Sequence, residues 1–483
     1  MNLCNINHSF NYELEKLCRI FLPNDKINIL NELKSDVVYA VCSINEKGDT
    51  ARAELFVEDK NVYRERKCEP LEKSQELALA TCLYECFCEL SGYKPPWGIL
   101  TGVRPVKLYH KLRDSLGEEK ANEYFRDTLF VDESKIRLSA DTMSPEYDII
   151  SRSQKDSFSL YISVPFCPSR CAYCSFVSHS VDKAKNLIEP YVELLVKEIA
   201  ETGRIAKELG LFLQTVYIGG GTPVALSAAQ IERVMTAVAE NFDLTGVEEY
   251  TVEAGRPDAI SEDKLVAIKN GGATRISINP QTMNDSVLRE IGRNHTAKEC
   301  EEAFHLARRV GFDNINMDLI AGLPTDTVES FKETVEKIIS MDPESVTVHS
   351  LSMKRASTLS VDGRLPDNKV GEDAAKMVDH ARRRLAEANI LPYYLYRQSK
   401  TVGNLENVGY SKKGYEGLYN VYIMDETHTI LACGASGVTK LREPGSTRIE
   451  RIYNYKYPYE YIDRFDEMLS RKEGIKRFYE TVK

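Results

Sequence analysis

The chain has 483 residues, of which 42% are hydrophobic and 28% are charged, and it carries a formal net charge of −10. This length exceeds one compact core of ordinary size and predicts two or three domains. The acidic balance argues against a general nucleic-acid-binding protein, because such proteins usually present a basic face.

Residues 1–150 have the pattern of a small α+β domain. DVVYAVCSI and ARAELFVED are strand-like, and a helix is predicted near SQELALATCLYECFCEL. In that helix Cys82 and Cys86 share a face at i, i+4, whereas Cys88 points elsewhere. We therefore expect buried helix cysteines, with a second metal site as the alternative. The polar stretch at 139–157 shows no clear periodicity and is predicted to be a linker.

From about Phe158 the chain alternates strands and helices. The predicted strands are FSLYISV, QTVYIGG, EEYTVEA, TRISINP, NINMDLIAG and SVTVHSLS. Ser227 and Gln230 have the spacing of a capping box at the start of one intervening helix. Such repeated β–α steps predict parallel strands joined by right-handed crossovers. A closed barrel needs eight units, and the alternation fades after residue 360, so we predict an open, partial barrel over 151–360.

Residues 361–483 are expected to form an extension that completes the substrate site. A helix to about Asn389 is followed by strand-like YYLYRQS and HTILACGASGV and by a Tyr-rich helical tail. The predicted fold class is thus α/β, with a partial (β/α)6 barrel, an N-terminal α+β domain and a C-terminal α+β extension.

The start of the chain, MNLCNINHSFNYELEKLC, lacks a basic stretch followed by an apolar core. No apolar run reaches the length of about 18 residues that crosses a membrane. We therefore expect a cytoplasmic protein without a membrane span. In that compartment the twelve cysteines are expected to be reduced thiols, and a tight cluster of them indicates a metal site.

One such cluster lies in VPFCPSRCAYC, at the carboxyl end of the first barrel strand. Its thiols, Cys167, Cys171 and Cys174, are soft ligands suited to zinc or to iron–sulfur clusters. Structural zinc normally takes four protein ligands, and His179 is the only close fourth candidate. A four-iron cluster held by three thiolates leaves one iron open to a small molecule, whereas a plain electron carrier ordinarily uses four.

The spacing C-x-x-x-C-x-x-C, at this place in the fold, resembles the signature of the radical S-adenosylmethionine (SAM) superfamily. The resemblance implies a radical SAM barrel in which the three cysteines hold a [4Fe–4S] cluster and SAM chelates the open iron. An electron from the cluster then cleaves SAM to a 5′-deoxyadenosyl radical. GGGTP, residues 219–223, resembles the family's contact for the SAM amino group, since glycines let backbone groups approach a ligand. Glu253 matches an acid that holds SAM; its alternative is a salt bridge at the barrel rim.

From about 158 to 440 the chain resembles the oxygen-independent coproporphyrinogen III dehydrogenase group, which includes haem-chaperone relatives. The segments that carry this are YISVPFC, YIGGGTP, RISINPQTMNDSVLREIGRNH and NINMDLIAGLPTDT. The resemblance implies that Tyr161, the residue we predict to be catalytic, lies by the cluster-bound SAM together with Gly220 and Glu253. It also implies a second SAM, held by Tyr173, Gly221, Thr222, Gln281, Arg293, Asp318, Val438 and Ser352. Without the family, Gln281 and Arg293 could be polar groups of the barrel rim.

The whole chain is most similar to the HemZ subfamily of this group. That subfamily carries an added N-terminal domain with a stretch like PPWGILTGVRPVKL, here at 95–108, and segments like YYLYRQ and NVGYS. Trp97, the only tryptophan, is expected to be a core anchor between domains, with ligand contact as the alternative. The best-defined dehydrogenases have a further Cys where this chain has Phe176, and the haem-chaperone relatives also have Phe there.

The resemblance implies oxidative decarboxylation of two propionates of coproporphyrinogen III to vinyl groups, giving protoporphyrinogen IX in haem biosynthesis. Hydrogen is taken from a propionate β-carbon, CO2 leaves and an electron departs to an acceptor. A low-potential donor such as flavodoxin or ferredoxin is the implied redox partner. The alternatives are a haem-binding chaperone of the same family and another radical SAM enzyme acting on a tetrapyrrole.

A substrate with four carboxylates calls for Arg and Lys side chains, which give charge-assisted hydrogen bonds. The candidates follow the sixth strand or lie in the segment YYLYRQSK, and each could instead be a solvated surface charge. They are Lys354, Arg355, Arg397 and Lys400.

Overall fold

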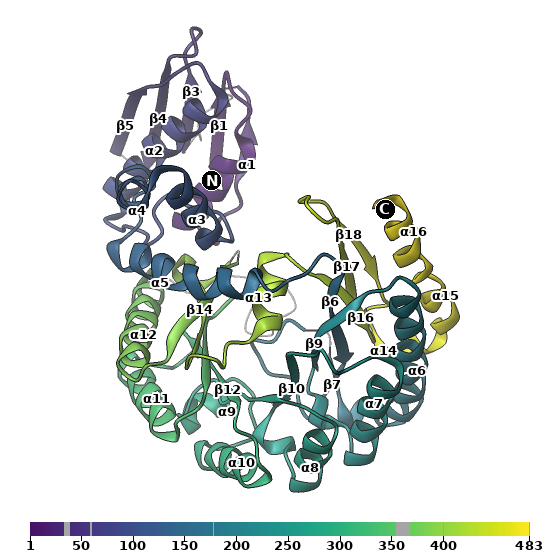
Figure 1. The fold of residues 1–483 in the computed structure, drawn as a ribbon. Helices are drawn as coiled ribbons and strands as arrows, with labels where there is room; N and C mark the ends of the chain where they lie inside the picture. The colour runs from purple at the N-terminus through teal and green to yellow at the C-terminus, as the bar shows by residue number, and fades with distance from the viewer. Residues whose placement is uncertain (33–38, 58–59, 177, 354–367, 399, 483) are drawn as a thin grey trace.

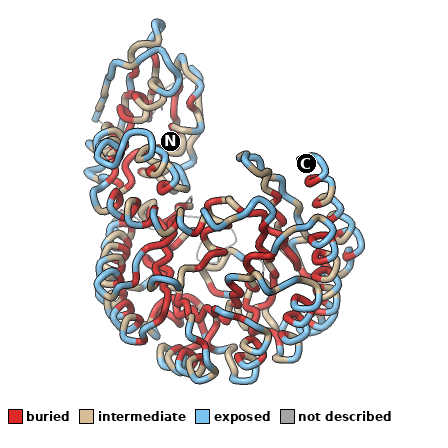
Figure 2. Tube along the Cα trace, in the orientation of Figure 1, coloured by how far each residue is buried: buried red, intermediate tan, exposed pale blue. Residues whose placement is uncertain are grey.

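The computed structural model describes residues 1–32, 39–57, 60–176, 178–353, 368–398 and 400–482. An N-terminal α+β part stands on one end of a broad curved sheet, and the C-terminal helices lie at its opposite end (Figure 1). Buried residues follow the strands of the curved sheet, and the outer helices turn exposed faces to solvent (Figure 2). Within the described residues, no helix combines the length and apolar character needed to cross a membrane.

The N-terminal part is built on a five-stranded sheet of order β2-β1-β3-β4-β5. In β4, Ala51, Ala53 and Leu55 alternate inward and pack under α2. The thiols of Cys82 and Cys86 in α2 donate hydrogen bonds to the Ala51 and Ala53 carbonyls at 3.8 and 3.6 Å. Burial raises the pKa of these thiols to about 11 and about 12, so they stay protonated and act as core residues. The elements are β1 (Asn2–Ile6), α1 (Asn11–Phe21), β2 (Asn28–Leu30), β3 (Ala40–Ile44), β4 (Thr50–Val57), β5 (Lys60–Lys67) and α2 (Glu72–Ser91).

The predicted linker at 139–157 is wrong over most of its length, because α5 continues to Ile150. Buried Ser139 and Thr142 donate their hydroxyls to the carbonyls one turn back, at 2.9 and 2.7 Å. These two polar residues therefore lie on the buried face of α5, and their hydroxyls make hydrogen bonds within the helix. Because they stand where apolar residues are expected, the sequence did not show the periodicity of a helix. This region contains α3 (Pro105–Leu116), α4 (Glu118–Glu123), the π-helical turn η1 (Tyr124–Thr128) and α5 (Glu133–Ile150).

The six predicted parallel strands form the middle of an eleven-stranded sheet, which confirms the open, partial barrel. The capping box of Ser227 and Gln230 is also confirmed, at the start of α7. The strands are β6 (Ser157–Val164), β9 (Phe212–Gly220), β10 (Glu249–Gly255), β11 (Arg275–Ile278), β12 (Ile315–Ala321) and β13 (Ser345–Ser350). The helices are α6 (Val181–Glu208), α7 (Ala228–Asn241), α8 (Glu262–Asn270), α9 (Asp285–Glu290), α10 (Ala297–Val310) and α11 (Val328–Met341).

The C-terminal extension covers both edges of this barrel sheet. β15 and β14 add antiparallel strands beside β13, while β16 pairs with β6 as a seventh parallel strand. The sequence predicted a strand in HTILACGASGV but not its pairing with β6, because this strand returns to the start of the barrel from a remote part of the sequence. The elements are α12 (Asn368–Glu387), β14 (Leu391–Arg397), β15 (Glu406–Ser411), α13 (Leu418–Asp425), β16 (Thr429–Cys433), β17 (Val438–Arg442), β18 (Ile449–Tyr453), α14 (Pro458–Asp463), α15 (Phe465–Ser470) and α16 (Glu473–Val482).

A buried ion pair fastens the C-terminal tail to the barrel. Lys472 places its Nζ 2.8 Å from the Glu198 carboxylate of α6, and both side chains are fully enclosed. Glu198 also accepts the Tyr461 hydroxyl at 2.6 Å and the Gly434 amide at 2.7 Å. These hydrogen bonds offset the cost of burying the two charges.

A second buried carboxylate joins the N-terminal part to the barrel. Glu406 in β15 accepts the Trp97 indole N–H at 2.7 Å and pairs with Lys135 of α5 at 2.5 Å. The Arg397 guanidinium lies 5.2 Å from the Trp97 ring centre. Trp97 has no exposed surface, so it is an anchor between domains, as expected.

Arg397 is not the solvated charge or the substrate contact that the sequence suggested. Its side chain is buried, and its guanidinium donates to the carbonyls of Leu100, Gly102 and Asn404. Its own amide donates to the Val103 carbonyl at 2.8 Å. Arg397 therefore holds the segment after Trp97 against β14.

Removing Lys135 should leave the Glu406 carboxylate buried without its cation. We expect Lys135→Met to lower the free energy of unfolding by about 3–5 kcal/mol, measured by urea denaturation. Adding Glu406→Leu should recover part of this loss, because the unpaired charge is then gone. The matched control is Lys298→Met, at an exposed pair with Glu302, where little or no change is expected. A wild-type midpoint in Lys135→Met would contradict this account of the clamp.

Candidate functional site

A cavity of about 490 Å³ opens at the carboxyl ends of the barrel strands. Parallel strands direct their carboxyl ends to one edge, where side chains from several strands meet. The cavity also reaches inward along β11 past Asn279 and Ser277 to Arg275. Most of the predicted site residues line it, namely Cys167, Cys171, Tyr173, Cys174, Gly220, Gly221, Thr222, Glu253, Gln281, Arg293, Asp318 and Ser352.

The cysteine loop presents its three thiols to the cavity, and two of the sulfur atoms accept hydrogen bonds. Thr222 Oγ1 donates to Cys167 Sγ at 3.4 Å, and Arg256 Nη1 donates to Cys171 Sγ at 3.3 Å. Burial raises the pKa of the Cys167 and Cys174 thiols. Donors aimed at sulfur suit thiolates that carry the negative charge of a bound cluster.

The loop geometry fits a multi-iron cluster better than a single ion. Among the described residues, no three His, Cys, Asp or Glu side chains converge closely enough to hold one metal ion. In a four-iron cluster each thiolate binds a different iron, so the sulfurs need not converge on one point. His179, the candidate fourth zinc ligand, does not line the cavity and packs edge-on against Tyr457 and Tyr459.

The glycine-rich turn after β9 is packed directly against the cysteine loop. The Gly221 amide donates to the Val164 carbonyl at 2.8 Å, and the Thr222 amide donates to the Phe166 carbonyl at 2.7 Å. A Cβ at Gly221 would lie 2.6 Å from the Phe166 carbonyl oxygen, so only glycine fits there. The glycine pattern therefore positions Cys167 as well as leaving backbone open to a ligand.

Glu253 lies at the end of β10 with its carboxylate enclosed by the cavity wall. Tyr217 donates its hydroxyl to Glu253 Oε1, and burial raises the pKa of the carboxyl to about 7. Tyr161 does not itself line the cavity. Its ring lies 6.2 Å from the ring centres of both Tyr217 and Tyr419, which stack on each other at 4.5 Å. The structure thus places Tyr161 behind Tyr217, which does line the cavity.

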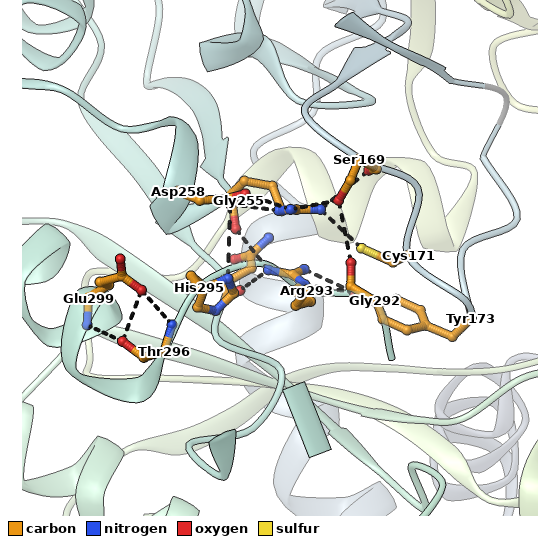
Figure 3. A network of polar contacts seen from close by, with 12 residues as sticks. Ser169, Cys171, Tyr173, Gly255, Asp258, Gly292, Arg293, His295, Thr296 and Glu299 are labelled. Carbon is orange, nitrogen blue, oxygen red and sulfur yellow. Dashed lines mark hydrogen bonds and ion pairs between the residues drawn. The ribbon is translucent and has the colours of Figure 1, made fainter. Parts of the chain in front are cut away.

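Tyr173 and Arg293 meet at the mouth of the cavity. Arg293 Nη2 donates to the Tyr173 hydroxyl at 2.9 Å, and its Nη1 donates to the Asn279 carbonyl at 2.6 Å. The Arg293 side chain is thereby fixed from both sides, in the network that Figure 3 shows.

Gln281 and Asp318 meet further along the wall through an isolated backbone bridge. The Gln281 amide donates to the Asp318 carbonyl at 2.9 Å, and the Ile320 amide donates to the Gln281 carbonyl at 3.0 Å. The Gln281 side-chain oxygen is buried without a protein hydrogen-bond partner, as expected where a ligand supplies the donor. Burial acts to raise the pKa of Asp318, but hydrogen bonds from His349 and Asn316 outweigh it and lower the pKa.

Arg275 is the deepest charged group of the cavity, and the sequence analysis did not select it. Only 1% of the residue is exposed, its Nη2 donates to Ser345 Oγ at 2.9 Å, and its Nε has no partner. No carboxylate of the described chain lies within ion-pair distance of it. The available signal was a charged residue opening the buried strand RISI. His349 and Arg256 were missed in the same way, although each follows a barrel strand or lies at its end.

The remaining predictions fall away from the cavity or outside the described residues. Val438 begins β17 and does not line the cavity. Lys400 is exposed, which agrees with the alternative that it is a solvated surface charge. Lys354 and Arg355 lie outside the described residues.

The comparisons with known proteins agree on one superfamily. The model of the radical SAM superfamily matches residues 161–338. The oxygen-independent coproporphyrinogen-III oxidase-like protein HemZ of Bacillus subtilis is 37% identical over 386 residues, which cover 79% of this chain and 77% of HemZ. The heme chaperone HemW of Lactococcus lactis is 33% identical over 58% of this chain and 69% of HemW.

Among solved structures, the coproporphyrinogen III oxidase HemN of Escherichia coli, described as a radical SAM enzyme, matches with a TM-score of 0.54. The two chains are 22% identical over 67% of this chain and 72% of HemN. This structural match confirms the fold of the barrel.

Glu253 should make the stability of the cofactor-free protein depend on pH. The pKa of Glu253 is raised from the ordinary 4.5 to about 7 in the folded protein. The contribution of Glu253 to the free energy of unfolding is therefore fully present below pH 4.5 and is lost as the pH rises through about 7. The advantage of Glu253→Gln in unfolding free energy should therefore grow by about 3 kcal/mol between pH 4.5 and 8. Urea denaturation over this pH range measures it, with the exposed Glu290→Gln as control. A difference that stays flat would contradict the raised pKa.

Proposed function

Because this chain belongs to the radical SAM superfamily, within the group of oxygen-independent coproporphyrinogen-III oxidase-like proteins, we propose that it oxidatively decarboxylates coproporphyrinogen III. Two propionate side chains become vinyl groups, and protoporphyrinogen IX is the product. Each conversion removes one hydrogen atom from the propionate β-carbon, releases CO2 and passes one electron to an acceptor. A low-potential donor such as flavodoxin or ferredoxin supplies the electron that starts the reaction.

One observation carries the proposal: a single cavity holds three thiols at its mouth and a buried, unpaired guanidinium at its floor. The buried Glu249 carboxylate acts on Arg275 from beyond ion-pair distance and accepts hydrogen bonds from Thr251 and the Leu418 amide, so the Arg275 Nε keeps a free donor. A carboxylate of the substrate would supply the missing partner through charge-assisted hydrogen bonds to Arg275. In the proposal the cofactor binds at the three thiols, and a substrate carboxylate binds at Arg275, in another part of the same cavity.

The superfamily uses a [4Fe–4S] cluster and SAM, which together supply a 5′-deoxyadenosyl radical able to abstract hydrogen. In our proposal Cys167, Cys171 and Cys174 hold the cluster, the glycine-rich turn at 219–223 contacts the amino group of SAM, and Glu253 holds SAM. The proposal assigns Arg293 and Asp318, which neighbouring hydrogen bonds hold in place, to binding a second SAM. The proposal assigns the tyrosines that line the cavity, Tyr173, Tyr217, Tyr394 and Tyr396, to limiting the access of water to the reacting groups.

A haem-binding chaperone is the second candidate function. It is favoured by the heme chaperones HemW of Lactococcus lactis and Bacillus subtilis, which are 33% and 31% identical to this chain. Phe176 stands where the best-defined dehydrogenases have a further cysteine, and it is 64% exposed at the cavity mouth. This candidate requires haem binding without conversion of propionates.

The deciding experiment is anaerobic incubation of the cluster-reconstituted protein with SAM, a reductant and coproporphyrinogen III. We expect monovinyl and divinyl products together with 5′-deoxyadenosine, and Cys171→Ala should abolish both. Mass spectrometry of the porphyrin fraction measures the products. Stoichiometric haem binding with no vinyl product would favour the chaperone, and a methylated or linear tetrapyrrole would indicate another radical reaction.

Arg275 provides a sharper test of the substrate class. Arg275→Gln should weaken binding of coproporphyrinogen III by about 10- to 100-fold, because one charge-assisted contact is lost. Binding of its tetramethyl ester should change little, since the ester carries no carboxylate. Ser345→Ala is the control that removes a neighbour but keeps the cation. Equal losses for acid and ester would assign Arg275 a structural role. Affinities are measured anaerobically by fluorescence quenching.

A further inference from the structure

Arg256 connects the cysteine loop to the turn after β10. Its Nη1 lies 3.3 Å from Cys171 Sγ and 3.3 Å from the Ser169 carbonyl oxygen. Its Nη2 donates to Ser169 Oγ at 3.0 Å. Figure 3 shows Ser169, Cys171 and Asp258 gathered in this network. One guanidinium thus contacts a predicted cluster ligand and the backbone that carries it.

Asp258 fixes the orientation of this guanidinium. The Arg256 Nε and Nη2 atoms donate to the two Asp258 carboxylate oxygens at 2.8 and 2.7 Å, a bidentate pair. Arg256 is only 3% exposed, so water does not screen its charge as it would at the surface. A lysine has no second donor in the right plane to hold both Asp258 and the sulfur.

The buried His295 lies beside Asp258 without adding charge. Its Nδ1 lies 3.9 Å from Asp258 Oδ1, and neither ring nitrogen has a hydrogen-bond partner. Burial and the nearby Arg293 lower the pKa of His295 to about 4, so the ring is neutral at pH 7. Arg256 is therefore the cation bound to Asp258, and its direction toward Cys171 is set by that pair.

We propose that Arg256 tunes the reduction potential of the cluster through its hydrogen bond to Cys171. This inference rests on the proposed cluster-holding role of the three thiols, but not on the identity of the substrate. Reduction adds negative charge to the cluster, and a buried N–H donor and cation beside a ligand sulfur stabilise that charge. Arg256 therefore makes the cluster easier to reduce, and Asp258 keeps the donor in place.

The test measures the potential of the reconstituted protein without SAM or substrate, by electron paramagnetic resonance during a redox titration. Arg256→Gln should shift the equilibrium toward the oxidised cluster by about tenfold, equal to ~59 mV for a one-electron couple. Asp258→Asn should shift it in the opposite direction, toward the reduced cluster, because the Arg256 cation remains and loses the carboxylate that neutralises it. The control is Arg289→Gln, an exposed arginine near the same loop, which should leave the potential unchanged.

Iron and sulfide content separate tuning from a structural role. An Arg256→Gln protein with a full cluster and the wild-type potential would overturn the proposal. Loss of the cluster in both Arg256→Gln and Arg256→Lys, with the wild-type potential in Asp258→Asn, would also overturn it and assign Arg256 to loop folding. A wild-type protein that binds no cluster would refute the proposed role of the thiols. Absence of vinyl products with an intact cluster would refute only the proposed reaction.

Discussion

An open parallel sheet has two free edges, and closing them is the constraint on which this structure depends. Unpaired strand edges invite association with other chains, and an incomplete barrel cannot pair its first strand with its last. Here the C-terminal extension covers both edges, with β15 beside β13 and β16 beside β6. The buried carboxylates Glu406 and Glu198 then fasten the N-terminal part to one side and the C-terminal tail to the other. The cavity lies between these two fastened sides.

The barrel could be predicted from sequence because its strands and helices follow one another in regular order. Each unit contacts its neighbour, so local periodicity already contains most of the topology. The same reasoning failed where the buried residues are polar. In α5 the buried Ser139 and Thr142 satisfy their own hydroxyls within the helix, and the segment read as a polar linker. It also missed the pairing of β16, a predicted strand whose partner β6 is remote in the chain.

The site divides in a similar way. Three cysteines at fixed spacing and acids at strand ends can be recognised from the sequence alone. Arg256, Arg275 and His349 carried only a weak signal, since a single charged residue in or near a strand has many uses. Arg397 shows the converse: its sequence position suggested a substrate contact, yet its guanidinium donates to three backbone carbonyls and lies over the Trp97 ring. Which of these roles an arginine takes depends on contacts between segments far apart in sequence.

The three buried arginines of the cavity region differ in how their charges are balanced, and this difference orders the site. Arg256 is neutralised by Asp258 and turned toward a sulfur. Arg293 is surrounded by neutral oxygens from Tyr173 and backbone carbonyls, so part of its field reaches the cavity. Arg275 has one neutral hydroxyl partner and an unused Nε. Glu249 acts on Arg275 only from beyond ion-pair distance, so the Arg275 Nε is left free by protein contacts, and an anionic substrate gains a charge-assisted hydrogen bond by entering with a carboxylate first.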